Sequence, residues 1–306
     1  MHMQNTSTTA LVSAFARAFH HRHHNPTIYD DPLADRLLTP QEYEGIARHM
    51  SQGIGFFCPG FTGSEEDALR WVAAQQLCPT PVGRAAFAEQ ALEMACGQGL
   101  TQYVNVAAGF DTFAFRAPAW AGGLQVWELD HPATGQEKQA RLQAAGIAVP
   151  GNVRFLSIDL NEQSWAHALH ADPAFHPERL CFFAFLGIAY YLPEEALRNA
   201  FRSLAALCPR GSLLAFDYPD EDALTDRASD RAKRQAALAE AAGEPMLAGY
   251  SLQRMEALLA DCDFGVAEHL TPPQITERFF RTHNEADPAH AMTAFDNVNY
   301  CLAVRA

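Results

Sequence analysis

Acidic side chains that each end an apolar run are the residues of this chain best suited to binding a ligand. The segment 101–116 reads TQYVNVAAGFDTFAFR, and its apolar run stops at Gly109. Glu128 and Asp130 end the next run, VWELD, 19 and 21 residues after that glycine. An acidic group about 20 residues beyond a glycine turn is where a ribose finds its hydrogen-bond acceptor. Side chains alternate along a strand, which points both carboxylates the same way, so either could serve.

A third apolar run, VRFLSID, ends at Asp159 and is followed by Leu160. An aspartate there can accept a hydrogen bond from the exocyclic amine of adenine, while the leucine packs on the ring. Ligands of doubly wound sheets bind at the carboxyl ends of the strands, where these acids would lie. The three strand ends together predict a ligand that contains adenosine.

The turn after the first run is poorly suited to phosphate groups. A pyrophosphate requires several glycines and a helix N-terminus, but Ala107 and Ala108 precede Gly109, and Asp111 adds a negative charge. An adenosine ligand without phosphates fits better, and S-adenosylmethionine is the common one. Its carboxylate needs a cation, for which Arg84 is a candidate. A nicotinamide-dependent oxidoreductase stays an alternative, disfavoured by the missing glycines and by the lack of a YxxxK dyad.

Alternating strands and helices must position these residues. Such alternation predicts an α/β fold with a doubly wound, mostly parallel seven-stranded sheet. Residues 1–100 are predicted to form an N-terminal helical extension, and 101–306 the ligand-binding α/β domain. The charged stretch at about 219–249 is too long for a tight connection and predicts a helical cap inserted over the sheet. The strand candidates are 103–108, 124–130, 153–159, 180–186, 212–218, 264–270 and 297–304, and the helices between the first five are 132–145, 162–170 and 194–207.

Composition narrows the class of protein. The 306 residues carry 22 basic and 36 acidic side chains, a formal net charge of −14. Such a surface repels phosphate backbones and anionic lipid, so we expect no nucleic-acid or membrane partner. Seven cysteines are scattered without a CxxC pair, and neither a signal peptide nor a long apolar segment is evident. These features favour a cytoplasmic protein with reduced thiols, and they leave its oligomeric state open.

The chain resembles a known family. The segments NPTIYDDPLADRLL, YVNVAAGFDTFAFR, VWELDHPATGQEKQARL, SIDL and FFAFLGIAYYLPEEALRNAF occur in this order. Together they are similar to the leucine carboxyl methyltransferase family, particularly its bacterial branch of polyketide O-methyltransferases that resemble the tetracenomycin enzyme. The resemblance covers most of 10–215. It implies a class I methyltransferase fold and S-adenosyl-L-methionine as the cofactor.

The resemblance also implies a role for particular residues. By position, Arg84 binds the methionine carboxylate, with Arg17 as a second cation, and Asp130 rather than Glu128 meets the ribose. The turn from Ala107 to Gly109 packs on the methionine moiety, and Asp159 with Leu160 contacts the adenine. The chain departs from the family in two places: the family usually has glycine where this chain has Ala107, and often a glutamate where it has Leu186. The second change implies a more apolar pocket beside the methyl group.

The acceptor decides which catalytic groups are needed. A carboxylate acceptor is ionised at pH 7 and needs no base, whereas a phenol or alcohol requires one within reach. His131 and Tyr191 are the candidates by position in the sequence. The stretch FHHRHHN contains His20, His23 and His24 but lacks the glutamate of an HExxH site, so we expect an exposed polar face and no metal. The aromatic residues of 53–63, expected to be loop-like, and of ERFFRTHN could line an acceptor pocket or the core.

The sequence therefore predicts an S-adenosylmethionine-dependent O-methyltransferase. The expected acceptor is a carboxyl, phenolic or hydroxyl oxygen of a small molecule, a secondary metabolite such as a polyketide. Two alternatives besides the oxidoreductase stay open. One is a protein C-terminal carboxyl methyltransferase, and the other is a catalytically silent cofactor-binding partner, which the loss of an acid at Leu186 would favour.

Overall fold

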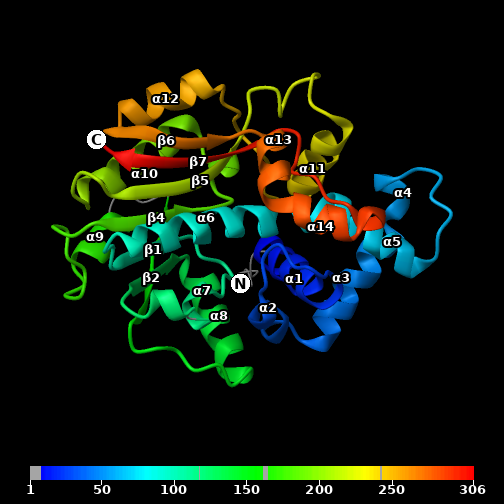
Figure 1. Ribbon diagram of the computed structural model, residues 1–306, viewed down its shortest axis with the longest axis horizontal. Coiled ribbons are helices and arrows are strands. Elements are labelled where there is room, and N and C mark those ends of the chain that lie inside the picture. The colour runs from blue at the N-terminus through cyan, green and yellow to red at the C-terminus, as the bar shows by residue number, and fades with distance from the viewer. Residues whose placement is uncertain (1–7, 117, 161–164, 242) are drawn as a thin grey trace, which may run out of the picture.

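Seven strands form one central sheet in the order β3-β2-β1-β4-β5-β7-β6. The computed structural model describes residues 8–116, 118–160, 165–241 and 243–306 (Figure 1). Strand β7 runs antiparallel to both neighbours, whereas the other strand pairs are parallel. The seven predicted strands and the mostly parallel sheet are confirmed. The strands are β1 Gln102–Val106, β2 Gln125–Asp130, β3 Val153–Ser157, β4 Cys181–Phe185, β5 Leu213–Pro219, β6 Phe264–Leu270 and β7 Val298–Arg305.

The two central strands β1 and β4 are buried at every position. Parallel strands that helices cover on both faces read as such continuous apolar runs. Strand β1 pairs with β2 on one side and with β4 on the other. The order of the strands therefore reverses between β1 and β4, and the carboxyl ends of these two strands flank the crevice where sheets of this kind bind ligands.

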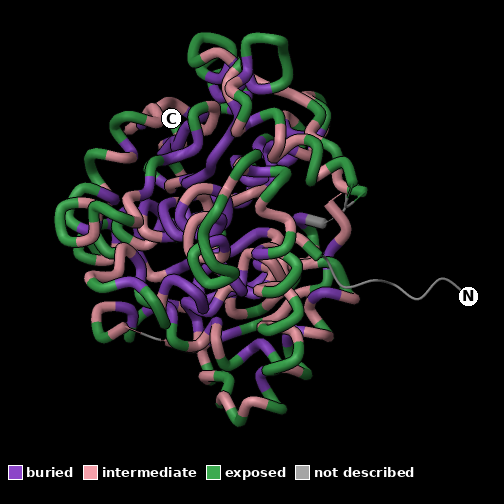
Figure 2. Tube along the Cα trace, turned by 90° about the vertical axis from the view of Figure 1, so that its right-hand side faces the viewer, coloured by how far each residue is buried: buried purple, intermediate pink, exposed green. Residues whose placement is uncertain are grey.

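Helices cover both faces of the sheet, because neighbouring residues on a strand point to opposite sides. Tyr103 and Phe182 belong to one hydrophobic cluster together with residues of α1 and α6. Val104 and Phe183 belong to a second cluster, with residues of α9, α10 and α12. Figure 2 shows the buried segments gathered in the interior. These helices are α1 Thr8–His23, α6 Pro79–Gly97, α9 Trp165–His170, α10 Glu194–Ala206 and α12 Leu252–Ala260.

Local signals account for several helix boundaries. Helix α3 begins with Pro40 after Thr39, whose side chain accepts a hydrogen bond from the Glu42 N–H while Glu42 accepts from the Thr39 N–H, a capping box. Helix α8 begins with Pro132, which fits the first helical position because it lacks an N–H. Of the helix predicted at 162–170, residues 161–164 lie outside the described residues. The remaining helices are α2 Pro32–Leu37, α3 Pro40–Gln52, α4 Ile54–Phe57, α5 Glu65–Val72, α7 Phe113–Arg116, α8 Pro132–Ala144, α11 Asp230–Ala241, α13 Pro272–Ile275 and α14 Arg281–Ala286.

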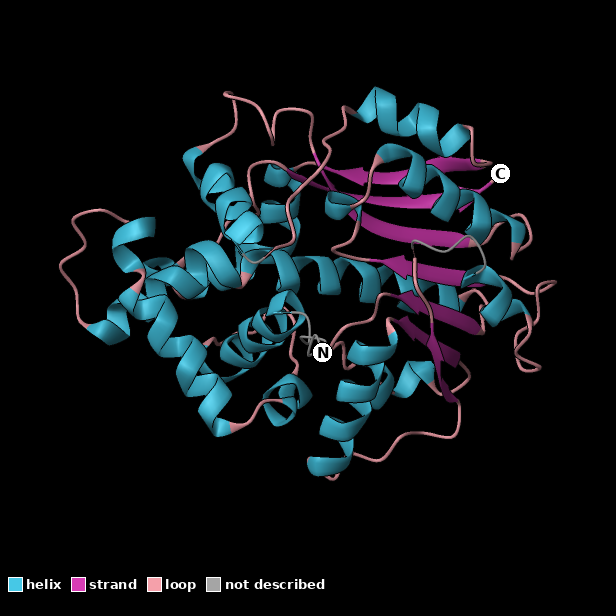
Figure 3. Cartoon of the chain, turned by 180° about the vertical axis from the view of Figure 1, so that it is seen from behind, coloured by secondary structure: helices cyan, strands magenta, loops and turns pink. Residues whose placement is uncertain are grey.

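The segments before β1 are helical, and they lie beside the sheet (Figure 3). One expectation here is wrong: 53–63 is not entirely a loop, because α4 forms a helical turn in which the Cys58 N–H donates to the Ile54 carbonyl at 2.7 Å. Phe57 is 4% exposed and joins the core, whereas Phe56 is exposed. Burial of one aromatic ring thus outweighs the low helix propensity of the glycines around it.

The expected cap is the segment that follows β5 and ends before Tyr250, and its two ends lie close together. Strand β5 ends at Pro219, and the Tyr250 N–H donates to the Pro219 carbonyl at 3.0 Å. A Cβ on Gly249 would lie 2.1 Å from the Asp220 carbonyl oxygen, so only glycine fits where the two ends meet. Helix α11 lies between these ends (Figure 1). Among the described residues, no helix is long and apolar enough to cross a membrane.

Candidate active site

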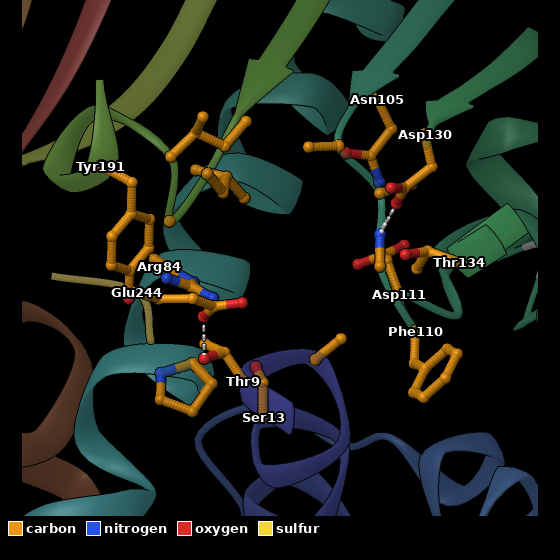
Figure 4. A pocket seen from close by; sticks show the side chains of 18 of the residues that line it. Thr9, Ser13, Arg84, Asn105, Phe110, Asp111, Asp130, Thr134, Tyr191 and Glu244 are labelled. Carbon is orange, nitrogen blue, oxygen red and sulfur yellow. Dashed lines mark hydrogen bonds between the residues drawn. The ribbon is translucent and has the colours of Figure 1, made fainter. Parts of the chain in front are cut away.

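A cavity of about 460 Å³ lies at the carboxyl ends of β1 and β4 (Figure 4). Its volume falls within the range of small-molecule sites, about 300–1,000 Å³. Its walls come from the start of α1, from α6, from the turns after β1, β2 and β4, and from the cap. The lining includes Thr9, Ser13, Arg17, Pro81, Arg84, Asn105, Ala107, Ala108, Gly109, Asp111, Asp130, Thr134, Leu186, Gly187, Ile188, Tyr191, Glu244, Pro245 and Leu247.

The turn after β1 has an unusual backbone. Ala107 and Gly109 adopt left-handed conformations with φ values of 51° and 52°. Glycine enters this region freely, whereas alanine does so at a cost of about 1–2 kcal/mol. The Gly109 N–H donates to the Asp130 carboxylate at 2.5 Å, which fixes the turn against the end of β2.

Asp130 is the acid of β2 that reaches the cavity. Its other oxygen accepts from the His131 N–H at 2.7 Å, and burial raises its pKa above the ordinary value. Glu128, two residues earlier, is buried and pairs with Lys138 of α8 at 2.6 Å. Burial raises the pKa of Glu128 to about 7, against the opposing charge of Lys138. The two carboxylates that the sequence left equivalent therefore have different surroundings, and Asp130 is the one available to a ligand.

Arg84 faces the cavity from α6 and is held by groups beyond it. Its Nη1 lies 3.5 Å from the Asp217 carboxylate of β5. Asp217 also accepts from the Gly187 N–H at 2.6 Å and from the Tyr190 hydroxyl at 2.7 Å. Gly187 has a φ of 73°, and a Cβ there would lie 2.2 Å from Arg84 Nη1. The bare glycine thus makes room for a guanidinium that can bind a carboxylate.

Arg17 also lines the cavity, but its guanidinium is engaged within the protein. It donates to Asp31 at 2.8 Å and to the Phe110 carbonyl at 2.6 Å. Although burial alone would raise the pKa of Asp31, the charge of Arg17 and the Thr112 hydroxyl lower it below its ordinary value. Arg17 and Asp31 therefore join the N-terminal helices to the turn after β1. The guanidinium of Arg17 positions this turn, and its hydrogen bonds to the protein compete with binding of a ligand.

The two candidate catalytic residues differ in their placement. Tyr191 lines the cavity, and burial raises the pKa of its hydroxyl to about 12. It therefore keeps its proton at neutral pH and can donate a hydrogen bond. His131 is exposed outside the cavity lining, where its Nδ1 accepts from the Ala133 N–H at the start of α8. The structure does not bring His131 to the cavity.

Asp159 and Leu160 follow β3 at the same edge of the sheet but do not line the cavity. Asp130 is paired in register with Ser157, and the Ile158 N–H donates to the Asp130 carbonyl at 2.8 Å. Leu160 is half-buried against the second hydrophobic cluster. Both residues therefore lie just beyond the acid of β2, and their contact with an adenine stays a prediction.

Sequence reasoning missed several polar residues of the cavity. Asn105 had a signal, because an amide in the middle of a buried strand needs a reason to be there. Asp111 was noted only for its charge. Thr9 and Glu244 had no local signal: they lie 235 residues apart in the sequence, and the Thr9 hydroxyl donates to the Glu244 carboxylate.

The expectation of an exposed face is wrong for two of the three histidines, whereas His23 is exposed as expected. His20 and His24 are buried, not on an exposed face, and their Nδ1 atoms lie 2.7 Å apart. His283 of α14 packs against them, with ring centroids 5.0 Å from His24 and 6.1 Å from His20. In the part of the chain that the structure describes, no group of three His, Cys, Asp or Glu residues could hold a metal ion. The aromatic residues of 53–63 and 277–284 do not line the cavity either.

Comparison with known proteins finds a matching family model and relatives named as methyltransferases. The model of the family described as leucine carboxyl methyltransferase matches residues 10–205. The chain is 36% identical over 310 residues, all of both chains, to a Bacillus subtilis (strain 168) protein named "Putative S-adenosyl-L-methionine-dependent methyltransferase YktD". A similarly named protein of Mycobacterium tuberculosis H37Rv is 31% identical over 77% of this chain and 74% of its own length. Among solved structures, a DUF574 family protein from Streptomyces avermitilis has a TM-score of 0.58 at 14% identity, over 85% of this chain and 97% of its own.

Proposed function

We propose that this chain, which belongs to the leucine carboxyl methyltransferase family, transfers a methyl group from S-adenosyl-L-methionine to an oxygen of a small molecule. The observation that carries the proposal is the cavity at the reversal of the strand order. One end of this cavity presents an acid, Asp130, and the other a cation, Arg84. A nucleoside with an amino-acid tail needs these two groups at opposite ends.

The residues present fit the cofactor. Asp130 would accept from the ribose hydroxyls and Arg84 would hold the carboxylate, while the left-handed turn from Ala107 to Gly109 gives the ligand close access to the backbone. Asp159 and Leu160 would meet the adenine at the adjoining edge. When bound, the cofactor supplies an electrophilic methyl group on sulfur. The fold is that of class I methyltransferases.

The protein contributes alignment and exclusion of water. The start of α1 and the cap close over the turn after β1: Ala10 Cβ lies 3.5 Å from where a Cβ of Gly109 would be, and Leu247 lines the opposite wall. Well-oriented proximity can contribute about 7–11 kcal/mol toward such a transfer. Tyr191, which keeps its proton, would donate a hydrogen bond to the methyl acceptor.

The charges of the lining favour a hydroxyl acceptor over a carboxylate. Among the described lining residues, the basic ones are Arg17 and Arg84. Arg17 is engaged with Asp31, and Arg84 would be occupied by the cofactor. Three acids among the described residues, Asp111, Asp130 and Glu244, also line the cavity. Because they outnumber the two cations, the lining would repel a second carboxylate. A phenol or alcohol of a secondary metabolite fits this environment better, with one of these acids as the base that it requires.

The seven cysteines, all unpaired, support a cytoplasmic location as part of the same proposal. None has a partner for a disulfide, as expected in a reducing compartment.

Matched acceptors test the proposal. The purified protein is given S-adenosyl-L-methionine with pairs of aromatic compounds that differ only in carrying a hydroxyl or a carboxyl group, and methylated product is identified by mass spectrometry. We expect transfer to hydroxyls, with Arg84→Gln abolishing it. Transfer to carboxyls alone would contradict the preference, transfer to protein C-termini would favour the alternative acceptor, and no transfer at all would favour a silent cofactor-binding protein.

A further inference from the structure

The amino-acid end of the cofactor carries a second charge, the ammonium group, which neither Asp130 nor Arg84 would bind. An α-amino acid has its ammonium group on the carbon next to its carboxylate, so a carboxylate at Arg84 places the ammonium within a few ångströms of it. A buried ammonium requires an acceptor, ideally an anion. The following inference rests on the proposed function and identifies that acceptor.

Three carboxylates line the cavity among the described residues: Asp111, Asp130 and Glu244. Two of them lie at the turn after β1: Asp111 is part of it, and Asp130, at the end of β2, is hydrogen-bonded to it. Asp130 accepts from the N–H groups of Gly109 and His131, and Asp111 Oδ1 accepts from the Phe113 N–H at 2.9 Å. Figure 4 shows these two acids together on one side of the cavity, and Arg84, Tyr191 and Glu244 on the other.

Contacts fix Glu244 at the Arg84 end. The Thr9 hydroxyl donates to its carboxylate from the start of α1. The Leu247 N–H donates to the Tyr190 carbonyl at 2.8 Å, which anchors this part of the cap beside the turn after β4. Tyr191 belongs to the same turn after β4, and Figure 4 shows its ring on the same side of the cavity as Arg84 and Glu244. The cation and the acid therefore share one end of the cavity.

Apolar residues adjoin these charges. Pro245 follows Glu244, Leu186 and Ile188 flank Gly187, and Pro81 precedes Arg84 by about one helical turn; all four line the cavity. Water is a poor competitor in such surroundings, so a charge pair formed there is stronger than at an exposed surface. Leu186 immediately precedes Gly187, over which the Arg84 guanidinium lies, and its side chain has no hydrogen-bond acceptor.

We propose that Glu244 of the cap binds the α-amino group of the cofactor. The cap thereby contributes to cofactor binding as well as covering the cavity, and the Thr9 hydroxyl positions the carboxylate. Because Glu244 lies on the cap rather than on the sheet, the cofactor's amino-acid end draws the cap and α1 together over the methyl group.

Two ligands that differ only in the amino group test this assignment. S-Adenosylhomocysteine carries it, and the analogue with a 3-carboxypropylthio group in place of homocysteine keeps the carboxylate but lacks it. Dissociation constants are measured by calorimetry for the wild type, Glu244→Gln and Glu240→Gln. Glu240 is an exposed acid of the same cap and serves as the control.

We expect Glu244→Gln to weaken S-adenosylhomocysteine at least tenfold and to leave the des-amino analogue within about twofold, while Glu240→Gln changes neither. An equal loss for both ligands, or no loss for either, would overturn the assignment while leaving the proposed function standing. Failure of the wild type to bind either ligand would refute the proposed function and this inference with it.

A rescue variant distinguishes the loss of a carboxylate from a structural change of the cap. Leu186→Glu places a carboxylate in the cavity lining next to Gly187, over which the Arg84 guanidinium lies. In the Glu244→Gln background it should restore most of the lost affinity for S-adenosylhomocysteine, again without changing that of the des-amino analogue. A double variant as weak as Glu244→Gln alone would contradict the shared subsite.

Discussion

At the scale of single residues, Gly187 holds the space in which Arg84 lies. Its φ of 73° is costly for any other residue, and an added Cβ would meet the guanidinium. We expect Gly187→Ala to cost about 1–2 kcal/mol of stability through backbone strain and to lower affinity for S-adenosylhomocysteine by displacing Arg84. Calorimetry and urea denaturation measure the two effects.

The control is Gly135→Ala in α8, where a Cβ meets nothing within 4 Å. It should gain about 0.5–1 kcal/mol from better helix propensity and keep its ligand affinity. Equal behaviour of the two variants would show that Gly187 has no special role.

Ala107 gives a second test of backbone strain. Glycine at this position removes the strain of a left-handed alanine, which stabilises the protein by about 1–2 kcal/mol. It also raises the conformational entropy of the unfolded chain, which destabilises the protein by about 0.4–1 kcal/mol. Ala107→Gly should therefore leave stability unchanged or raise it by up to about 1.6 kcal/mol. Ala108→Gly, at a buried neighbour without a positive φ, should lower it. Thermal melting distinguishes them, and destabilisation by both variants would contradict the strain.

At the scale of elements, strand β2 and helix α8 share a buried ion pair. Glu128 and Lys138 are each 2% exposed and lie 2.6 Å apart. Removing one charge leaves the other buried without a partner, which costs about 3–5 kcal/mol. We expect Glu128→Gln to destabilise by that amount in urea denaturation at pH 8.5, above the raised pKa of Glu128. The double variant Glu128→Leu/Lys138→Met should recover most of it, since it removes both charges; if it is as unstable as the single variant, the pair is not the cause.

The elements also show how far the sequence predicts the structure. The strands follow from apolar runs of the right length, and their parallel order follows from the helices between them. Strand periodicity alone could not choose between Glu128 and Asp130, because period-2 alternation treats them alike; the family resemblance favoured Asp130, and burial under α8 separates the two. Thr9, Glu244 and the buried histidines were beyond reach for a different reason: contacts between distant segments decide their environment, and no local pattern encodes those contacts.

At the scale of the whole molecule, the histidines join the first and last helices. Burial lowers the pKa of His20 to about 3 and that of His24 to about 4. In the unfolded chain both titrate near 6.5. Between these values the unfolded state binds more protons than the folded state, so stability must fall as the pH drops below about 6.5.

The slope is about 1.4 kcal/mol per pH unit for each histidine, measured by urea denaturation between pH 7.5 and 5. The carboxylate of Asp31, whose folded pKa is lowered, acts in a separate window, because its contribution is lost below about pH 4. A double variant, His20→Gln/His24→Gln, should flatten the dependence above pH 5, while the exposed His49→Gln should not. An unchanged slope in the double variant would assign the effect to other groups.

The central claim is that the cavity holds S-adenosyl-L-methionine between Asp130 and Arg84. The most direct measurement is thermal melting with S-adenosylhomocysteine and, in parallel, with NADH, for the wild type, Asp130→Ala and the exposed control Glu93→Ala. At a hundredfold excess over Kd the ligand should stabilise the wild type and the control by about 2.7 kcal/mol, and Asp130→Ala should lose that shift. A shift with NADH alone, or a shift that survives in Asp130→Ala, would contradict the claim.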